Sequence, residues 1–568
     1  MQVGCATAVV LASLVSVVLR RSVPIPIGLS PLDDGLFLRS AAAIVRGDWL
    51  GPYDNLTLSK GPAYPVFIAL MHEVGWELKV GEQVTYLLAA AVLALAIWSA
   101  TRRLVTSVAA YVVVALDPVS FNSQGAELIR DSWHASLGLL FPSAVFLALH
   151  LALTQRRWWA WAGAAVLAGI SGGVYWLCRE EGAAILPSIA VIVVGTPLLG
   201  GRAKGRGQGQ GHEHGHGQEQ RTPVGTIGRY GCALALVGIT FLAPLLAVRG
   251  LNAEHYGVAI TTDTTDGSFP AAYADWTRVG GAGAQHRVPI TPAQRLAVYR
   301  VSPAAREIEP FLEAPDNSWG DPHLFSGAQT IWAIRDATTL AGQYSSAARS
   351  QAFFARLDAE INAGCDSGVL ACSPRLPTPL QSLQRASPGD LTRVSGAITL
   401  SVLTGRGLLD RSTPRGSSVV STRAGVAALV AGVPADDAGA AAQRAQFDAT
   451  SWRLDVLGAA YGPLLVGLAV IAVVATSLGW WRMRRPRSPL LVLGLALAVG
   501  FVARTGLMAL ITVADYNATI ARYQLASRSL LVGATVVGCA VALELLTDRR
   551  SASRSDRVSA SRSSSGAS

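Results

Sequence analysis

The chain alternates between long apolar runs and short polar segments, and ten of the apolar runs are long enough to cross a membrane. A spanning segment needs about 20 mostly apolar residues, and it must be helical because lipid offers the backbone no hydrogen-bond partners. We therefore predict an all-α polytopic membrane protein of about ten transmembrane helices. The runs lie at 4–19, 83–100, 104–121, 133–153, 158–178, 183–199, 230–248, 454–476, 488–512 and 528–546.

Composition and charge agree with this class. The chain is 51% hydrophobic and 15% charged, against roughly 25% charged in ordinary globular proteins. The net charge of +10 comes from short basic clusters between apolar runs, which argues against nucleic acid as a partner. Arg20 and Arg21 follow the first run and no basic segment precedes it, so we interpret it as a span rather than a signal peptide.

The basic clusters also predict an orientation. With a cytoplasmic N-terminus, every predicted inner loop is basic, whereas the outer loops carry carboxylates and mixed charge. This is the positive-inside pattern, and it predicts a multi-pass protein of the cell (plasma) membrane with both termini cytoplasmic. The basic clusters are Arg102–Arg103, Arg156–Arg157, the segment 202–229, the segment 482–487 and the tail after Leu546.

Five regions follow from these spans. Residues 1–248 form an N-terminal transmembrane module whose first outer loop is 20–82, and residues 454–546 form the C-terminal helices. The Gly-, His- and Gln-rich segment 200–229 is predicted to be a flexible cytoplasmic loop, and the basic tail 547–568 to be disordered. The polar segment 249–453 is predicted to be a large extracytoplasmic domain of mixed or unknown fold.

Two smaller features bear on the outer side. The stretch from Tyr64 to Leu78 is apolar but short, which indicates an interfacial or re-entrant helix rather than a crossing. Cys365 and Cys372 lie in a polar part of 249–453, and they are expected to form a disulfide if that segment is extracytoplasmic.

The first outer loop holds the most informative pair of residues, Asp33 and Asp34. Adjacent carboxylates can divide the roles of general base and metal ligand. The alternative is a solvated acidic turn that caps the following helix, since Asp favours helix N-termini. The pair alone favours the second interpretation, an acidic turn that caps the helix.

The order of motifs around the pair resembles a known family. After Asp33 and Asp34 come an amphipathic stretch, then GDWLGPY, then KGPAYP leading into an apolar helix. This order resembles the first periplasmic loop of the GT-C glycosyltransferases, in the branch of lipid A aminoarabinose transferases, protein mannosyltransferases and RgtA/B/C/D-like enzymes. The resemblance implies that Asp33 is the catalytic base and Asp34 its helper. Asp34 would also be the ligand of a divalent cation, Mg²⁺ or Mn²⁺, if one is required.

Further matches cover residues 4–200 and 454–546 but not the 249–452 segment. ELIRDSWHASLGLL, GGVYWLCREEGAAILP and ADYNATIARYQLASRSLL resemble polar span ends of the same family. Cations there suit the donor's phosphate, although each Arg has an alternative role as an interfacial anchor. The implied phosphate-binding residues are Lys60, Arg130, Arg179 and Arg522, with Asp131, Glu180, Glu181 and Tyr523 in support.

The resemblance implies an inverting transfer of a sugar from a polyprenyl-phosphate donor to an extracytoplasmic acceptor, which is an envelope glycan, a lipid or a protein. One alternative is a polysaccharide polymerase or ligase of another polytopic class, with its essential residues in 249–452. A second is a transporter or a non-catalytic scaffold. Transporters often carry internal repeats and polar residues at mid-span, and we find neither pattern in this sequence.

Overall fold

The structure, a computed structural model, describes residues 2–25, 31–121, 127–155, 157–200, 223–280, 287–375, 382–383, 386–406, 408, 425, 427–482, 488–515, 518–519 and 521–564. Every regular element in these residues is helical, apart from one isolated bridge between Val279 and Cys372. The segment 201–222, which holds most of the predicted cytoplasmic loop, lies outside the described residues.

Ten helical segments are long and apolar enough to cross a membrane, and each overlaps one of the predicted runs. The prediction of an all-α polytopic architecture is therefore confirmed. The segments are α1 (Gln2–Arg21), α4 (Leu78–Thr101), α5 (Leu104–Ala115) with η1 (Pro118–Phe121), α7 (Asp131–Thr154), α8 (Trp158–Cys178), η2 (Glu180–Ile185) with α9 (Leu186–Gly200), α10 (Pro223–Tyr256), α20 (Trp452–Arg482), α21 (Leu490–Ala514) and the first part of α22 (Ala521–Ser564).

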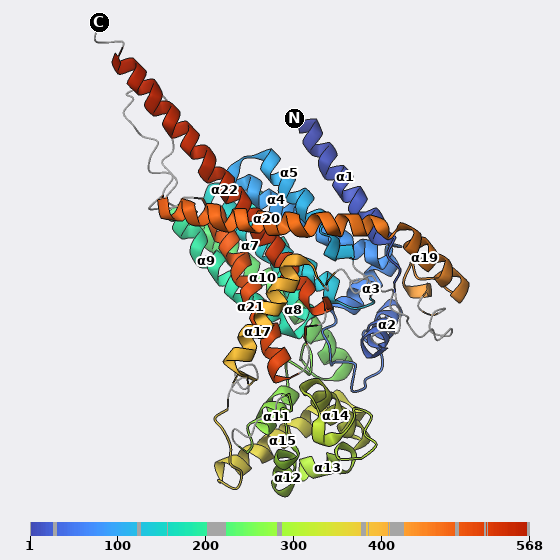
Figure 1. Cartoon of the computed structure of the whole chain (residues 1–568). Coiled ribbons are helices and arrows are strands. Elements are labelled where there is room, and N and C mark those ends of the chain that lie inside the picture. Colours follow the sequence, from blue (N-terminus) through green and yellow to red (C-terminus); the bar gives the residue numbers. More distant parts are fainter. Residues whose placement is uncertain are drawn as a thin grey trace.

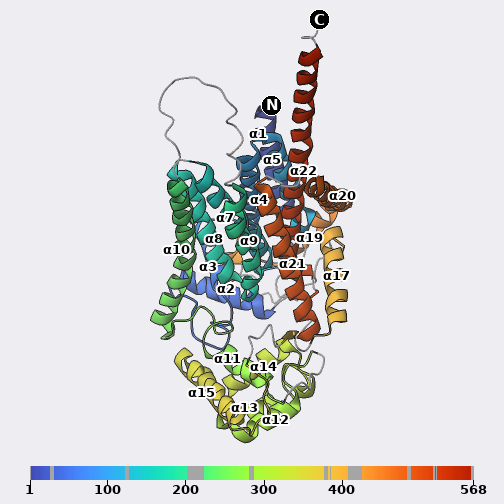
Figure 2. The ribbon, with the colours of Figure 1, turned by 90° about the vertical axis from the view of Figure 1, so that its left-hand side faces the viewer.

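The helices form a bundle with two distinct ends. α7 lies near the centre, where most of its side chains are buried against α4, α8 and α22. Both chain termini lie at one end of the bundle, and a compact domain of short helices lies at the opposite end (Figures 1 and 2). α20 crosses the other helices obliquely along one side and packs against α22 (Figure 1).

The first loop contributes two helices at the domain's end of the bundle. α2 (Pro31–Val45) lies across the bundle rather than along it (Figure 2). α3 (Ala63–Glu73) has 11 residues, which is too few to cross a bilayer. Its rings pack inward, and the ring centroids of Phe67 and Trp133 lie 4.4 Å apart. α3 therefore closes this end of the bundle without spanning it.

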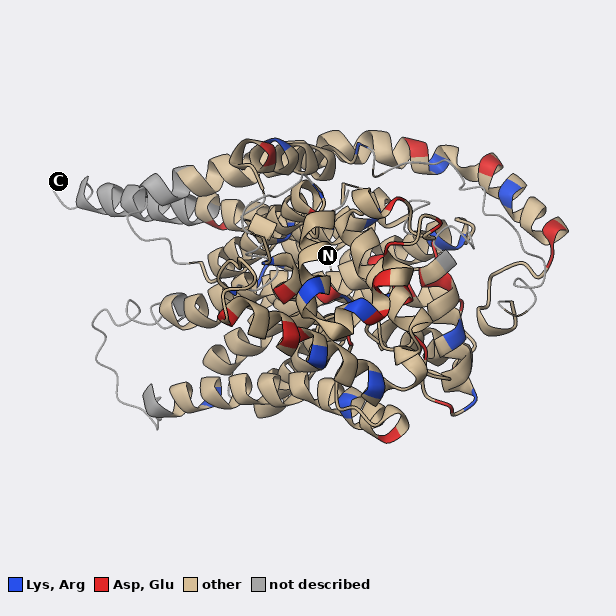
Figure 3. Cartoon of the chain, turned by 90° about the horizontal axis from the view of Figure 1, so that it is seen from below, with Lys and Arg blue, Asp and Glu red and all other residues tan. Residues whose placement is uncertain are grey.

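The compact domain has a hydrophobic core of its own. Phe269, Trp276, Phe325, Phe353 and Phe354 are buried together between its helices. Seen from this end, acidic and basic residues are interspersed over the molecule (Figure 3). The helices are α11 (Ser268–Thr277), α12 (Pro292–Val301), α13 (Pro303–Leu312), η4 (Pro322–Leu324), α14 (Gly327–Leu340), η5 (Gln343–Ser345) and α15 (Ala347–Asp366).

The domain is narrower than the predicted 249–453. α10 continues to Tyr256, and α17 (Pro388–Thr404) buries Ile398 and Val402 in the core of the bundle. α19 (Asp437–Thr450) leads directly into α20. The sequence pattern missed α17 because it has 17 residues and carries Asp390 in its first turn, so it does not read as a span.

The end of the chain also differs from the prediction. α22 continues without a break from its apolar part to Ser564, although the tail 547–568 was predicted to be disordered. The tail holds Ala, Arg and Ser with neither Gly nor Pro before Gly566. Helix propagation from an existing end needs no new nucleus, which accounts for the extension.

Candidate active site

The first loop, between α1 and α4, brings a carboxylate and an ammonium group into contact. Lys60 Nζ lies 2.9 Å from Asp33 Oδ1, and the two side chains are 17% and 24% exposed. Both acidic residues lie in the first turn of α2, where the helix dipole favours carboxylates. Asp34 is 3% exposed, and neighbouring helical residues point about 100° apart. Asp33 is therefore the member of the pair that a substrate can reach.

Three cations set the charge state of Asp33. Burial alone would raise the pKa of its carboxyl. The positive charges of Lys60, Arg130 and Arg522 together outweigh burial and lower the pKa below its usual value, and Lys60 contributes most. The carboxylate is consequently ionised at neutral pH. It can accept a proton, although a lowered pKa also makes it a weak base.

Arg130 connects the end of α8 to α2. It stands immediately before α7, where its Nη1 donates to the carbonyl oxygen of Cys178 at 2.8 Å and its Nη2 lies 2.6 Å from Glu180 Oε2. Its guanidinium carbon lies 5.8 Å from the ring centroid of Phe37, one helical turn after Asp33. The side chain thus lies beside the face of α2 that carries Asp33.

Arg179 is held by carboxylates on two sides. It lies in extended conformation between α8 and η2, and it forms an ion pair with Asp131 at the start of α7. Its Nε and Nη2 donate to the two oxygens of Glu181 at 2.9 Å and 3.1 Å. Its guanidinium carbon lies 5.0 Å from the ring centroid of Tyr523. This arrangement fixes Arg179 against the first turn of α22.

Arg522 completes the group from the other end of the sequence. It lies in the first turn of α22, not in the outer loop where it was predicted, because the helix begins at Ala521. Its Nη1 lies 3.4 Å from Glu127 Oε2, and its Nη2 donates to the Tyr523 hydroxyl at 3.2 Å. The side chain is 18% exposed.

Glycine allows the loop to approach the bundle. A Cβ atom at Gly61 would lie 1.7 Å from the carbonyl oxygen of Leu177, near the end of α8. The residue after Lys60 therefore cannot carry a side chain in this conformation. The close approach places Lys60 near the α8 end that also holds Arg179.

The compact domain docks on the segment just before Lys60. Arg335 of α14 is fully buried, and both its terminal nitrogens lie 3.0 Å from the carboxylate oxygens of Asp263. Arg335 also donates to the backbone carbonyl of Asn55. The Asn55 amide in turn donates to Asp336 at 2.7 Å, and Asp336 accepts from the indole of Trp319 at 2.6 Å. These contacts tie the first loop to α14.

Backbone contacts extend the docking up to Lys60. The Asp263 amide donates to the carbonyl of Leu58 at 2.8 Å, and the Thr264 hydroxyl donates to the carbonyl of Ser59 at 2.8 Å. Lys60 Nζ then lies 5.7 Å from the ring centroid of Trp332 on α14, within the range of a cation–π contact. The domain therefore forms one wall of the site, although its residues were not among those predicted.

The structure brings the predicted residues into one neighbourhood. Asp33 contacts Lys60, and Arg130 contacts Glu180. Arg179 contacts Asp131, Glu181 and Tyr523. Arg522 also contacts Tyr523. Within the described residues, no group of three His, Cys, Asp or Glu side chains is arranged to hold a metal ion. The Lys60 ammonium lies against Asp33, and Asp34, the predicted cation ligand, is buried next to it.

A second buried charge cluster adjoins the site, and sequence reasoning missed it. Lys79 Nζ lies 2.8 Å from Glu82 Oε1, which also accepts from the Tyr64 hydroxyl at 2.7 Å. Lys79 further donates to the backbone carbonyl of Glu127 at 2.6 Å. Arg20 lies 3.6 Å from Glu82. The signal was available, because charged residues at span ends mark functional or paired groups.

The interpretation that the spans lack polar groups at mid-span is wrong. Arg504 lies inside α21 with 1% of its surface exposed, and its charge acts on Glu181. Arg528 of α22 forms a two-point ion pair with Asp117 at 3.0 Å. Each arginine is a single charged residue in or beside its apolar run, so the pattern still predicts a span. The Arg528–Asp117 pair is neutral as a unit and joins α22 to η1.

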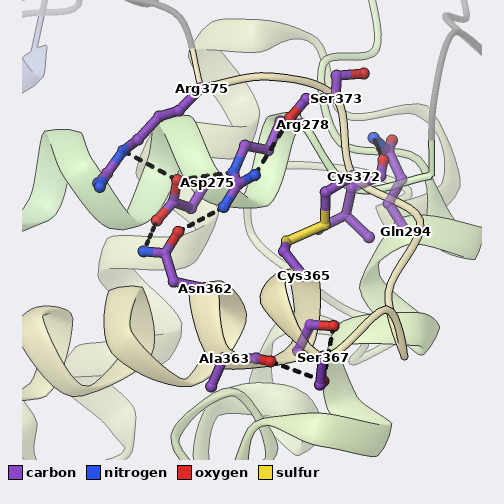
Figure 4. The surroundings of a disulfide bond; sticks show 12 residues. Asp275, Arg278, Gln294, Asn362, Ala363, Cys365, Ser367, Cys372, Ser373 and Arg375 are labelled. Carbon is purple, nitrogen blue, oxygen red and sulfur yellow. Dashed lines mark hydrogen bonds and ion pairs between the residues drawn. A yellow bond between two sulfur atoms is a disulfide. The ribbon is translucent and has the colours of Figure 1, made fainter.

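Cys365 and Cys372 are joined by a disulfide at the edge of the compact domain (Figure 4). Asp275 lies nearby and contacts Asn362, Arg278 at 3.0 Å and Arg375 at 3.2 Å. Burial and the neighbouring carboxyl of Asp358 raise the pKa of Asp275 to about 6. These residues lie among α11, α15 and the segment after the disulfide, and they stabilise the domain away from the candidate site.

Comparison with known proteins gives two similar solved structures. One is ArnT from Cupriavidus metallidurans in the apo state, with 16% identity, a TM-score of 0.31, and coverage of 94% of this chain and 78% of ArnT. The other is ArnT from the same organism bound to undecaprenyl phosphate, with 15% identity, a TM-score of 0.29, and coverage of 95% and 78%. No family model and no curated protein matches.

At such TM-scores the similarity carries neither residue roles nor a substrate across to this chain.

Proposed function

We propose that this protein is a membrane glycosyltransferase that moves a sugar from a polyprenyl-phosphate donor to a hydroxyl group of an extracytoplasmic acceptor. The observation that carries the proposal is the ionised, partly exposed Asp33, which is paired with Lys60 and lies near Arg130 and Arg522. A carboxylate next to several cations provides both a base for a hydroxyl and contacts for a phosphate.

The reaction is a single displacement. Asp33 removes the proton from the acceptor hydroxyl while the hydroxyl oxygen forms a bond to the anomeric carbon. The bond between that carbon and the phosphate oxygen breaks on the opposite face of the sugar, and its electrons leave with the polyprenyl phosphate. Lys60, Arg130 and Arg522 stabilise the negative charge that develops on the leaving phosphate.

Donor binding would also make Asp33 a stronger base. In the free protein the three cations lower the pKa of Asp33, which favours the carboxylate but weakens its pull on a proton. A donor phosphate that contacts the same cations compensates their charge and adds a negative charge nearby. Both effects raise the pKa of Asp33. The base thus becomes effective only when the donor is present.

The position of the site is consistent with an enzyme of the membrane surface. The first loop and the compact domain lie at the end of the bundle opposite both termini (Figures 1 and 2). The basic clusters near the termini and inner loops favour a cytoplasmic location for that other end. The acceptor is then an envelope glycan, a lipid or a protein, and the lipid of the donor remains in the bilayer.

The test is transfer of radiolabelled sugar from a polyprenyl-phosphate pool in membranes that contain the full-length protein. Asp33→Asn should lower the rate by about 10²- to 10⁴-fold, as expected for loss of a general base. Asp48→Asn is the matched control, because Asp48 lies in the same loop, is 64% exposed and lies 3.6 Å from Arg46. Full activity of both Asp33→Asn and Asp34→Asn would remove the mechanism.

A further inference from the structure

A cavity of about 410 Å³ lies beside the candidate site, at the end of α1 and the start of α4. Its polar wall contains four cations, Arg20, Arg21, Lys79 and Arg453, and one carboxylate, Glu77. Four positive charges and one negative charge give the lining an excess of three positive charges. Arg20 and Lys79 are almost fully buried, so part of this charge lies at the base of the cavity and not on the open surface.

The existing ion pairs do not cancel this excess. Arg21 binds Glu77 through Nε at 3.0 Å and Nη2 at 2.5 Å. Arg20 and Lys79 share the single carboxylate of Glu82, at 3.6 Å and 2.8 Å. Arg453 lines the cavity from the start of α20. With Glu82 included, four cations face two carboxylates among the described residues, so the cavity favours an anion.

The other wall of the cavity is apolar and continues onto a lipid-facing surface. Val18, Leu19, Val23 and Ile25 line it from α1 and the residues that follow. Val18 also belongs to an exposed apolar ridge on α1, together with Leu11 and Leu14, each of which is more than half exposed. An exposed apolar ridge on a spanning helix faces acyl chains. The cavity therefore offers cations to a headgroup and an apolar path to the chain attached to it.

We propose that this cavity binds the phosphate headgroup of an anionic membrane lipid, at a site separate from the one around Asp33. The two sites share a wall, because Lys79 in the cavity donates to the backbone carbonyl of Glu127, whose carboxylate contacts Arg522. The proposal concerns binding alone, so it stands or falls independently of glycosyl transfer.

The experiment measures lipid binding to the full-length protein by native mass spectrometry. The protein is titrated with phosphatidylglycerol, or with phosphatidylcholine that has the same acyl chains. Arg21→Gln and Arg453→Gln remove exposed cations and leave Arg20 and Lys79 in place, which protects the fold. Each should weaken phosphatidylglycerol binding by about fivefold, and the double variant by roughly 25-fold. Arg46→Gln is the control, because Arg46 is 61% exposed and does not line the cavity.

Inorganic phosphate and glycerol phosphate identify the source of the anion. Selective binding of phosphatidylglycerol that is lost in the double variant and kept in Arg46→Gln supports the proposal. Binding of the free phosphates with the same dependence on Arg21 and Arg453, without binding of the lipid, would show a site for soluble anions and overturn it. Equal lipid binding by the wild type and the double variant would also overturn it.

Discussion

Replacing Lys60 with Met tests the central pair of the proposed mechanism. The charges of Lys60 and Asp33 are 2.9 Å apart, so they interact by about 6 kcal/mol at an effective dielectric constant of 20 and about 1.4 kcal/mol in bulk water. Both side chains are partly exposed, so the lower part of this range applies. Loss of one preorganised donor should lower the transfer rate by about 10²- to 10³-fold.

The pH profile separates this role from a general loss of folded protein. Without Lys60, burial raises the pKa of Asp33 and only Arg130 and Arg522 oppose it. The acid limb of kcat/KM should therefore move to higher pH in Lys60→Met. Lys60→Arg is the control, because it keeps the charge and should keep the acid limb. The reasoning is refuted if Lys60→Met loses activity but its acid limb coincides with that of the wild type.

Two further predictions concern the compact domain. Arg335→Met leaves Asp263 buried without its partner, and it should destabilise the protein by about 3–5 kcal/mol; thermal unfolding of the full chain measures this, and an unchanged midpoint would contradict the docking role. Cys365→Ser with Cys372→Ser opens a loop whose ends are seven residues apart and should cost about 2–3 kcal/mol. In intact cells, a membrane-impermeant maleimide should label Cys365 and Cys372 only after reduction. Labelling of these two residues without reduction would argue against an extracytoplasmic disulfide.

The sequence was sufficient to predict the long apolar helices but not the structure of the segments that connect them. Spans are specified by one local property, a continuous apolar run, and all ten appear in the structure. α17 was not predicted because it is short and because it is buried by contact with α20, α21 and α22, which the local sequence does not reveal. The predicted start of the last span lies after the true start of α22. Arg522, Gln524 and Arg528 are polar, so the apolar pattern excluded them, but in the fold they have partners.

The same distinction applies to the site. Arg179 could be predicted because it stands at the end of an apolar run, and Asp33 because it belongs to a recognisable motif in the loop after the first run. Trp332 and Arg335 were not, because they lie in a helix of ordinary amphipathic pattern, and their importance comes from contact with Asn55 and Lys60 far away in the chain. Arg504 carried a local signal that went unused, since a single Arg inside a span is costly unless it has a partner.

The docking of α14 and α22 around the first loop has a consequence for biosynthesis. Asp33 and Arg522 are separated by 489 positions along the chain, which takes about 25 to 100 s to translate at 5–20 residues per second. Lys60 and Arg130 follow Asp33 early in synthesis, whereas Trp332, Arg335 and Arg522 emerge much later. The contacts of Arg522 with Glu127 and Tyr523 can therefore form only after the last helix has been made, so this neighbourhood is completed at the end of synthesis.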